Sequence, residues 1–332
     1  MTEPQEEEID ETIVFSASTT VISHIHKALK SIALVSGQAS LTITAEGLQF
    51  SVDDGSHACQ AHLFFKRDLF SSYQFNPAVN DDEEESWFVT TRLSLASLNE
   101  CLHIFAGPSG NRAATDGSAA GDFHEIRATS TCRFVYKGRG SSLIVYLREG
   151  RNLSTKCQLS TFESTGAGFD ELDENSIELV KEKLVQHVIL KANLLEGHFK
   201  ELDDLKTEVV SFIGSSMGPQ YFNIKSIGQN KNESTFSFPN DKSVLETFVI
   251  LKESDNADEP TALPEPGENV IVSHSYQFES IRKCRPALEL ADRASIRCDH
   301  NGTMSIQCMC KVSDAEGDAR RSFIDFRFRA RE

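Results

Sequence analysis

The alternation of hydrophobic and polar positions along the chain predicts short strands, interrupted by a few segments with the spacing of an amphipathic helix. Residues 12–17 have the β-branched and aromatic content of a strand. In the next segment, 20–34, hydrophobic residues recur at the spacing of one helix face: Val21, Ile25, Ala28, Leu29 and Ile32. Two strands around a Glu46-Gly47 turn follow at 41–54, and another at 57–65. The predicted order is strand, helix and three strands.

The same order recurs three more times. The second unit consists of a strand at 87–91, a helix at 93–105 and strands at 125–136, 142–147 and 153–162. The third consists of a strand at 185–191, a helix at 193–206 and strands at 209–213, 221–226 and 234–238. The fourth consists of a strand at 270–276, a helix at 278–285 ended by Pro286 and strands at 295–299, 304–311 and 323–330. Such a repeated unit cannot bury its own sheet face, so neighbouring units must pack together.

The segment 163–178 divides the four units into two pairs. It has two glycines, no proline and no periodic hydrophobic face, and its second part is strongly acidic. Such a segment does not fold alone and predicts a solvated connection. We therefore expect a disordered acidic head at 1–11, a first domain at 12–162, an interdomain connecting loop at 163–178 and a second domain at 179–332.

Composition places the chain among ordinary soluble proteins. Of its 332 residues, 39% are hydrophobic and 25% charged, and the net charge is −17. This charge argues against a protein that coats nucleic acid with a basic surface, but it leaves room for a local basic lining. The acidic, polar start predicts no signal peptide, and no hydrophobic run is long enough to span a membrane.

Candidate chemical motifs are sparse. The eight cysteines form no CxxC pair, which indicates buried free thiols. His24 and His26 are two residues apart on a helix and face different ways, which does not suit a metal pair. No phosphate-binding or nucleophile-elbow motif occurs. We therefore predict no catalytic site, no metal site and no cofactor.

Four such units in two halves, joined by one acidic connection, resemble the sliding DNA clamps. Four short sequence segments indicate which sliding clamp the chain resembles most. They are CLHIFAG at 101–107, HFKELDDLKTEV at 198–209, YKGRGSSLIVYLREG at 136–150 and RKCRPALEL at 282–290. They are similar to the nine-one-one DNA-damage checkpoint clamp, and among its three subunits to the Rad-one type of fungi. The resemblance covers residues 12–329, with insertions at 76–86, 107–122 and 253–268.

This resemblance implies an α+β, PCNA-like DNA-clamp fold, in which two similar domains place antiparallel sheets outside and two helices each along the inside of a ring. Such a ring needs helices that carry positive charge toward DNA. Helix 20–34 has Lys27 and Lys30 and no acidic residue, and helix 277–286 has three basic residues against Glu279. Helices 93–105 and 193–206 are net acidic. The predicted DNA-facing residues are His24, Lys27, Lys30, Lys200, Arg282, Lys283 and Arg285. On the first helix we place Ser31 on the same face as His24 and Lys27.

By position in the clamp plan, the strands at 153–162 and 232–238 are expected to be open edges that pair with other chains. The candidate interface residues are Ser154, Lys156, Gln158 and Ser160 on the first edge, and Ser234, Phe236 and Phe238 on the second. In clamps the connecting loop overlies a groove that captures short peptides. Phe169 and Leu172 are the candidates to contact such a groove, although a plain tether fits them equally well.

The expected function is that of one subunit of a heterotrimeric checkpoint clamp in the nucleus. Its expected partners are the two other subunits, an ATP-driven clamp loader, duplex DNA and primer-template junctions bound without sequence specificity, and signalling and repair proteins, with no membrane. Two alternatives remain. One is a homotrimeric replicative clamp of the same fold. The other is a 3′→5′ exonuclease, for which the acidic pairs Asp53-Asp54 and Asp203-Asp204 are the candidates.

Overall fold

The computed structural model describes residues 13–76, 88–106, 130–149, 153–163, 176–229, 231–253, 260–313 and 319–331. The predicted acidic head, Phe169 and Leu172 of the connecting loop, the insertion 107–122 and most of the insertion 76–86 lie outside the described residues.

The first half of the chain follows the predicted order of elements, with three short additions. The additions are a 3-10 turn η1 and the strands β5 and β10. Its elements are β1 (Phe15–Thr19), α1 (Ile22–Ile32), β2 (Gln38–Thr44), β3 (Gly47–Asp53), β4 (Cys59–Lys66), η1 (Arg67–Leu69), β5 (Ser72–Phe75), β6 (Phe88–Ser94), α2 (Leu95–Ala106), β7 (Thr131–Tyr136), β8 (Leu143–Glu149), β9 (Leu153–Leu159) and β10 (Thr161–Phe162).

The second half repeats this order. Its elements are η2 (Lys181–Lys183), β11 (Leu184–Lys191), α4 (Ala192–Asp204), β12 (Thr207–Ser215), β13 (Phe222–Gly228), β14 (Glu233–Phe238), β15 (Leu245–Ile250), β16 (Ile271–Gln277), α5 (Phe278–Ile281), η3 (Arg282–Cys284), α6 (Arg285–Leu290), β17 (Arg293–Asp299), β18 (Met304–Ser313) and β19 (Ala319–Phe328). The strand β15 lies between the third and fourth predicted units, where the predicted order has no strand.

Three sheets organise the molecule, and the central one joins the two halves. Its ten strands run in the order β10-β6-β2-β3-β4-β19-β18-β17-β11-β15. The junction is the antiparallel pair of β4 and β19, in which Leu63 lies opposite Ile324. A five-stranded sheet (β5-β1-β7-β8-β9) and a four-stranded sheet (β14-β13-β12-β16) flank it. Because the last strand of the chain pairs with a strand of the first half, the halves share one continuous backbone hydrogen-bond network.

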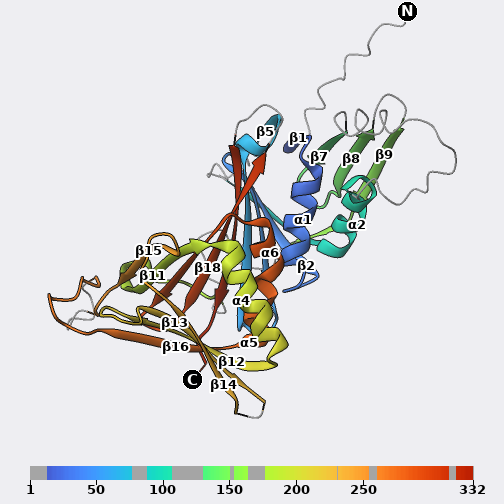
Figure 1. Ribbon diagram of the computed structural model, residues 1–332. Coiled ribbons are helices and arrows are strands. Elements are labelled where there is room, and N and C mark those ends of the chain that lie inside the picture. Colours follow the sequence, from blue (N-terminus) through green and yellow to red (C-terminus); the bar gives the residue numbers. More distant parts are fainter. Residues whose placement is uncertain are drawn as a thin grey trace, which may run out of the picture.

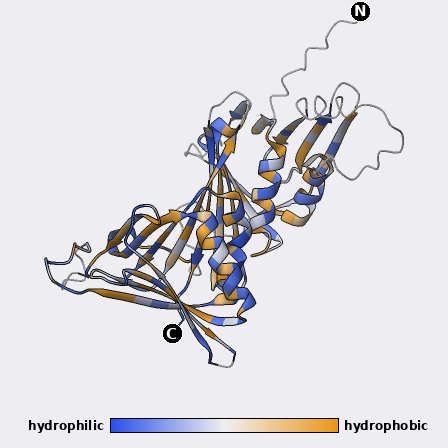
Figure 2. Cartoon of the chain, viewed as in Figure 1, coloured by the Kyte–Doolittle hydropathy of each residue, from blue (hydrophilic) through white to orange (hydrophobic). Residues whose placement is uncertain are grey.

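The helices form one row between the two smaller sheets. Helix α2 contacts α1, α1 contacts α6, and α6 contacts α4. Figure 1 shows this row in front of the central sheet. In Figure 2 the helices carry hydrophobic and hydrophilic residues on different sides, as expected for helices that cover a sheet with one face. The fold is therefore α+β with the sheets on one side and the helix row on the other.

Strand β19 illustrates how the alternation produces this layering. Ile324, Phe326 and Phe328 are almost fully buried in the main hydrophobic core beneath the helices. Asp325 and Arg327 point to the opposite face of the sheet, where they contact each other. The strand predicted at 323–330 thus has a two-residue period, which places the core on the helix side of the central sheet.

The fourth helical segment corrects the predicted stop at Pro286. The chain continues through η3 into α6, which ends at Leu290, and Pro286 lies in the first turn of α6. Proline is tolerated there because the first amides of a helix have no partner within that helix. The break falls instead at η3, which ends two residues before the proline.

Two glycines make tight turns possible. Gly47 begins β3 with φ 152°, and a Cβ at this position would lie 2.1 Å from the carbonyl oxygen of Phe65 on β4. Gly302 has φ 78° in the turn between β17 and β18, where a Cβ would lie 2.7 Å from Ala330. The second glycine allows the tight turn that joins β17 and β18 as an antiparallel hairpin.

Candidate nucleic-acid interface and subunit edges

The exposed face of α1 carries two lysines. Ser23, Lys27, Lys30 and Leu34 are exposed and follow one another at helical spacing. Ile22, Ile25, Leu29 and Ile32 are buried on the opposite side. The lysine side chains have no ion pair to any residue in the described ranges, so their charge is available to a ligand.

His24 and Ser31 do not share that face, contrary to the sequence prediction. The His24 Nε2 lies 2.7 Å from the Ser322 Oγ on β19, and the hydroxyl of buried Ser31 donates to the carbonyl oxygen of Ala28 at 2.7 Å. Burial, and to a smaller degree Lys27, lowers the pKa of His24 to about 4. His24 is therefore neutral at physiological pH and contacts the central sheet. The hydrophobic positions of α1 define its buried face, but they do not reveal that β19 covers one flank of the helix.

The predicted basic face of the fourth helical segment is largely occupied by carboxylates of the protein. The Lys283 Nζ lies 3.2 Å from an oxygen of Asp54, whose side chain is only 5% exposed. The Arg285 guanidinium lies 3.0 Å from Glu196 and 3.6 Å from Asp203, both on α4. Lys283 and Arg285 thus join structural elements, and their charge is compensated within the protein, which the sequence did not predict.

Arg282 and Lys200 are more exposed than Lys283 and Arg285, as expected for residues that face DNA. Arg282 is half-exposed, but it lies 3.5 Å from Asp203 and 3.7 Å from Glu279. Lys200 on α4 is exposed and has no ion pair to a residue that the structure describes. The second half therefore offers little uncompensated positive charge on its helices.

The pKa of Asp54 shows that the ion pair with Lys283 stabilises the charged form. Burial acts to raise this pKa, but hydrogen bonds from Ser56 and Lys283 and the charge of Lys283 outweigh it and lower the pKa. Since Asp54 follows β3 and Lys283 lies in η3, the pair ties the first half of the chain to the second.

A histidine pair between α1 and α2 escaped the sequence reasoning. The ring centroids of His26 and His103 are 5.5 Å apart. His26 is half-buried and His103 exposed. A helical projection places His26 beside Lys30, one turn away, but nothing in the local pattern shows that α2 packs on this flank.

The two predicted edge strands are open in the structure. Strand β9 pairs with β8 and β14 with β13, and each stands at the end of its sheet. Ser154, Lys156, Gln158 and Ser160 are exposed on or just after β9. On β14 the side chains of Phe236 and Phe238 instead turn inward onto His198 of α4, at ring distances of 4.9 and 5.0 Å, and Phe238 is buried. The side chains of Phe236 and Phe238 therefore pack on the helix side of this edge strand, and Ser234 is half-buried on the same face.

The end of the connecting loop is fixed on the outer face of the central sheet. The amide of buried Ile177 donates to the Gln60 Oε1 at 2.8 Å, and Arg327 donates to the Ile177 carbonyl oxygen at 3.1 Å. Three residues further on, the Val180 amide donates to Asp299 at 3.1 Å. Gln60 and Arg327 come from the two strands that join the halves, so the loop ends on the seam between them.

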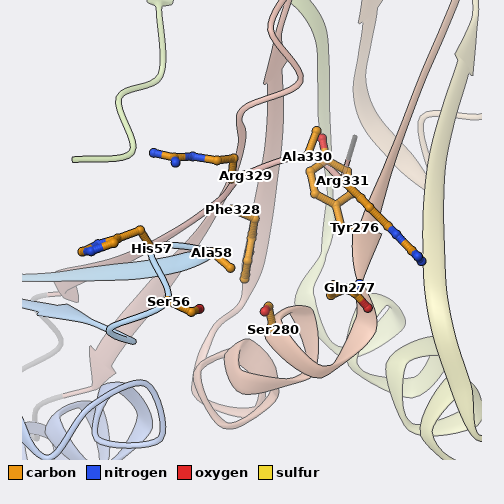
Figure 3. A pocket seen from close by; sticks show the side chains of 10 residues that line it. All are labelled: Ser56, His57, Ala58, Tyr276, Gln277, Ser280, Phe328, Arg329, Ala330 and Arg331. Atoms are coloured by element: carbon orange, nitrogen blue, oxygen red, sulfur yellow. The ribbon is translucent and has the colours of Figure 1, made fainter. Parts of the chain in front are cut away.

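Two cavities flank this seam. A cavity of about 730 Å³ adjoins the outer face of β4, with Phe64, Lys66 and Tyr73 among its lining residues. A smaller cavity of about 160 Å³ lies between the turn at Ser56, helix α5 and the C-terminal segment. Figure 3 shows Ser280 and Phe328 at its centre and the ends of Arg329 and Arg331 directed to opposite sides. The smaller cavity assembles no group of side chains suited to catalysis.

The acidic pairs proposed for a nuclease do not converge. Asp53 accepts from Gln60 and lies 3.2 Å from the His57 ring, and Asp54 binds Lys283. Asp203 lies on α4 among arginines. Within the ranges that the structure covers, no group of three or more His, Cys, Asp or Glu side chains could hold a metal ion. No helix there has the length and hydrophobicity required to cross a membrane.

Comparison with known proteins agrees with this geometry. The family model described as Repair protein Rad1/Rec1/Rad17 matches residues 14–310. The DNA damage checkpoint control protein rad1 of Schizosaccharomyces pombe is 28% identical over 313 residues, which cover 94% of this chain and 85% of that protein. The mouse cell cycle checkpoint protein RAD1 is 26% identical over 316 residues, covering 95% of this chain and 93% of that protein.

Solved structures show the same architecture. The proliferating cellular nuclear antigen (PCNA) of Thermococcus kodakaraensis has a TM-score of 0.62 at 14% identity, covering 96% of this chain and 100% of its own. PCNA of Entamoeba histolytica has a TM-score of 0.61 at 11% identity, with the same coverage. Together with the helix row and the flanking sheets, these matches show that the chain has the PCNA-like clamp fold and belongs to the Rad1/Rec1/Rad17 family of repair proteins.

Proposed function

We propose that the chain is one subunit of a heterotrimeric DNA-damage checkpoint clamp of the nucleus. In this proposal the ring encircles duplex DNA, is placed at damage sites and primer-template junctions by an ATP-driven loader, and recruits signalling and repair proteins. The observation that carries the proposal is structural: one row of helices lies between two sheets that end in open strands, β9 and β14, at opposite ends of the molecule (Figure 1).

The open strands support closure by other chains. An edge strand presents unpaired backbone N–H and C=O groups, which favour addition of a further strand. The two edges differ in their chemistry. Lys156 lies on β9 with its Nζ over the Tyr146 ring, whereas Glu233 begins β14 and binds Lys225. Because the edges are dissimilar, we expect each to meet a different neighbour.

Few helix charges are free to contact DNA, which favours a ring that holds DNA by enclosing it. Lys27, Lys30 and Lys200 could contact phosphates, and such contacts are independent of sequence and weaken with salt. A ring that holds DNA by enclosure needs few contacts of this kind and can slide. The proposed mechanism is therefore retention by closure, with recruitment on the outer surface.

Co-expression and sizing test this proposal. We expect the purified chain to be a monomer alone and to enter a three-subunit complex when co-expressed with the two other subunits of a checkpoint clamp. A stable homotrimer of the chain alone would instead favour a replicative clamp of the same fold. Failure to join the candidate partners would contradict the proposal.

The chain is proposed to be non-enzymatic, with the exonuclease as the alternative. The decisive comparison is purified wild-type protein against the variant with alanine at Asp53, Asp54, Asp203 and Asp204, assayed with labelled DNA and Mg²⁺ or Mn²⁺. We expect no activity above background in either protein. A metal-dependent activity that persists through purification and disappears in the variant would establish the alternative.

Recruitment has a candidate site in the cavity beside β4. Phe64 lies on the outer face of the central sheet, where Ile177 also binds. Lys66 and Phe323 lie on the same face, with the Lys66 Nζ 5.3 Å from the centroid of the Phe323 ring. A peptide with one aromatic and one aliphatic anchor could insert here. We expect Phe64→Ala to weaken binding of such a peptide at least about fivefold, since a buried aromatic contact is lost. Unchanged affinity would place the groove elsewhere.

A further inference from the structure

The two halves of the helix row differ in how their positive charge is used. In the second half, Lys283, Arg285 and Arg282 all lie within 4 Å of carboxylates. In the first half, Lys27 and Lys30 are exposed and unpaired among the described residues. A polyanion that passes along the row therefore meets uncompensated positive charge chiefly on α1.

A pair of titratable rings lies beside these lysines. The imidazoles of His26 and His103 have their centroids 5.5 Å apart with a tilt of 36° between the rings, which brings α1 and α2 together at the surface of the row. Burial, followed by His103, Lys30 and Lys27, lowers the pKa of His26. In the absence of a ligand, the surrounding positive charge thus opposes protonation of His26.

The charged groups around this pair are few. On α1 they are Lys27 and Lys30, and the helix has no acidic residue. On α2 they are His103 and Glu100, which precedes it by one turn. From the neighbouring η3 and α6, Lys283 and Arg285 are directed to Asp54 and Glu196. Among the described residues of these helical elements, Glu100 is the one carboxylate close to the pair in sequence, so a phosphate beside the rings would add negative charge where little is present.

We propose that His26 and His103, together with Lys27 and Lys30, form a pH-responsive contact for the phosphates of duplex DNA, so that this subunit holds DNA mainly through its first half. The inference rests on the proposed clamp function and deepens it. An approaching phosphate stabilises the protonated form of His26, so DNA binding takes up a proton and strengthens as the pH falls. The lysines supply attraction at every pH, and protonation of His26 adds to it as the pH falls.

The experiment measures binding of the full-length chain to a short fluorescent duplex at low salt, with EDTA present so that no metal bridges the imidazoles. We expect the wild type to bind roughly three- to tenfold more tightly at pH 6.0 than at pH 8.0, because His26 can take up one proton when a phosphate is bound. The variant His26→Gln/His103→Gln should bind like the wild type at pH 8.0 and lose most of this change. His187→Gln should retain it.

His187 is a matched control. It is a half-buried histidine whose pKa burial and Arg297 also lower, but its ring contacts Ser295 on the outer face of the central sheet. The variant Lys27→Ala/Lys30→Ala should bind more weakly at both pH values, with the slope of log affinity against log salt reduced by about 2. In this variant the increase in affinity should also begin at a higher pH, since these lysines oppose protonation of His26.

An unchanged pH response in the histidine double variant would overturn the inference, as would absence of binding by the wild type at pH 6.0. A salt slope unaffected by the lysine double variant would also overturn it. A separate measurement tests the proposed clamp function. If the assembled ring is not retained on closed circular DNA at either pH, the proposed function is wrong. If the ring is retained and only the pH response is unaltered, the histidine contact alone is wrong.

Discussion

At the scale of single residues, the basic side chains of η3 and α6 hold the molecule together. Lys283 binds nearly buried Asp54 from the first half, and Arg285 binds Glu196 and Asp203 on α4. A buried charge that loses its partner is costly, because its desolvation is no longer compensated. These residues therefore stabilise the helix row, and Lys27, Lys30 and Lys200 are the exposed helix lysines left for a ligand.

Lys283→Met tests this role. We expect it to lower the free energy of unfolding by about 2 kcal/mol, since Asp54 stays buried without its cation. Urea denaturation measures the change, and Lys200→Met, which removes an exposed lysine, should change stability by less than about 0.5 kcal/mol. Because the folded pKa of Asp54 is lowered from 3.8, its contribution is present above that pH and is lost as the pH falls below it. Equal effects of the two substitutions would contradict the role assigned to Lys283.

His24 predicts a second pH dependence, in a different range. Its folded pKa is about 4, below the usual 6.5, so the unfolded state binds more protons between these values. The neutral ring therefore contributes stability above pH 6.5 that is lost as the pH falls toward 4, amounting to about 3 kcal/mol at most. In His24→Gln the stability should fall less over this range, as measured by denaturation at successive pH values. Parallel pH profiles for the two proteins would count against it.

These residues also show what the sequence could and could not predict. The exposure of Lys27 and Lys30 follows from helical periodicity, which is a local property. The partners of His24, Lys283 and Arg285 are Ser322, Asp54 and Glu196, all distant in sequence. Contacts of this kind arise from the packing of elements and leave no mark on the local pattern.

At the scale of elements, the order of strands and helices was predictable because alternation and helical spacing are strong in most segments. The end of the fourth helical segment was not predictable, because a proline in the first turn of a helix and a proline after the last turn look alike in sequence. The turn at Gly47 is specified more tightly, because a Cβ there would collide with the backbone of β4.

Gly47→Ala should therefore destabilise the fold by about 2 kcal/mol or more, through collision with the Phe65 carbonyl and a positive φ. Gly37 provides the matched control, since a Cβ at that position would meet no atom within 4 Å. Thermal unfolding of both variants gives the comparison. A Gly47→Ala protein as stable as Gly37→Ala would show that the β2–β3 turn can move away from the Phe65 carbonyl on β4.

The open strands β9 and β14 yield a prediction about assembly. When the chain joins its partners, amide hydrogens on both strands should exchange more slowly, because unpaired N–H groups find acceptors on neighbouring chains. Hydrogen exchange of the isolated chain and of the complex measures this, with β12 inside its sheet as the internal control. Unchanged protection on both strands would rule them out as the subunit contacts.

At the scale of the whole molecule, the ten-stranded sheet joins two similar halves and keeps their helices in one row. The pairing of β4 with β19 makes this row continuous across the halves. A rigid, continuous row with open strands beyond it is the arrangement that a segment of a ring requires. The clamp fold is shared with PCNA even though only 11–14% of residues are identical in the two structures compared.

Retention of the assembled complex on DNA tests the central claim most directly. The complex is loaded onto nicked circular DNA by a clamp loader with ATP, and the bound fraction is measured after a wash in high salt, before and after the circle is cut once. Enclosure predicts retention on the intact circle and release from the linear ends, because salt removes phosphate contacts but not a closed ring. Equal retention on both forms, or loss from both, would contradict it.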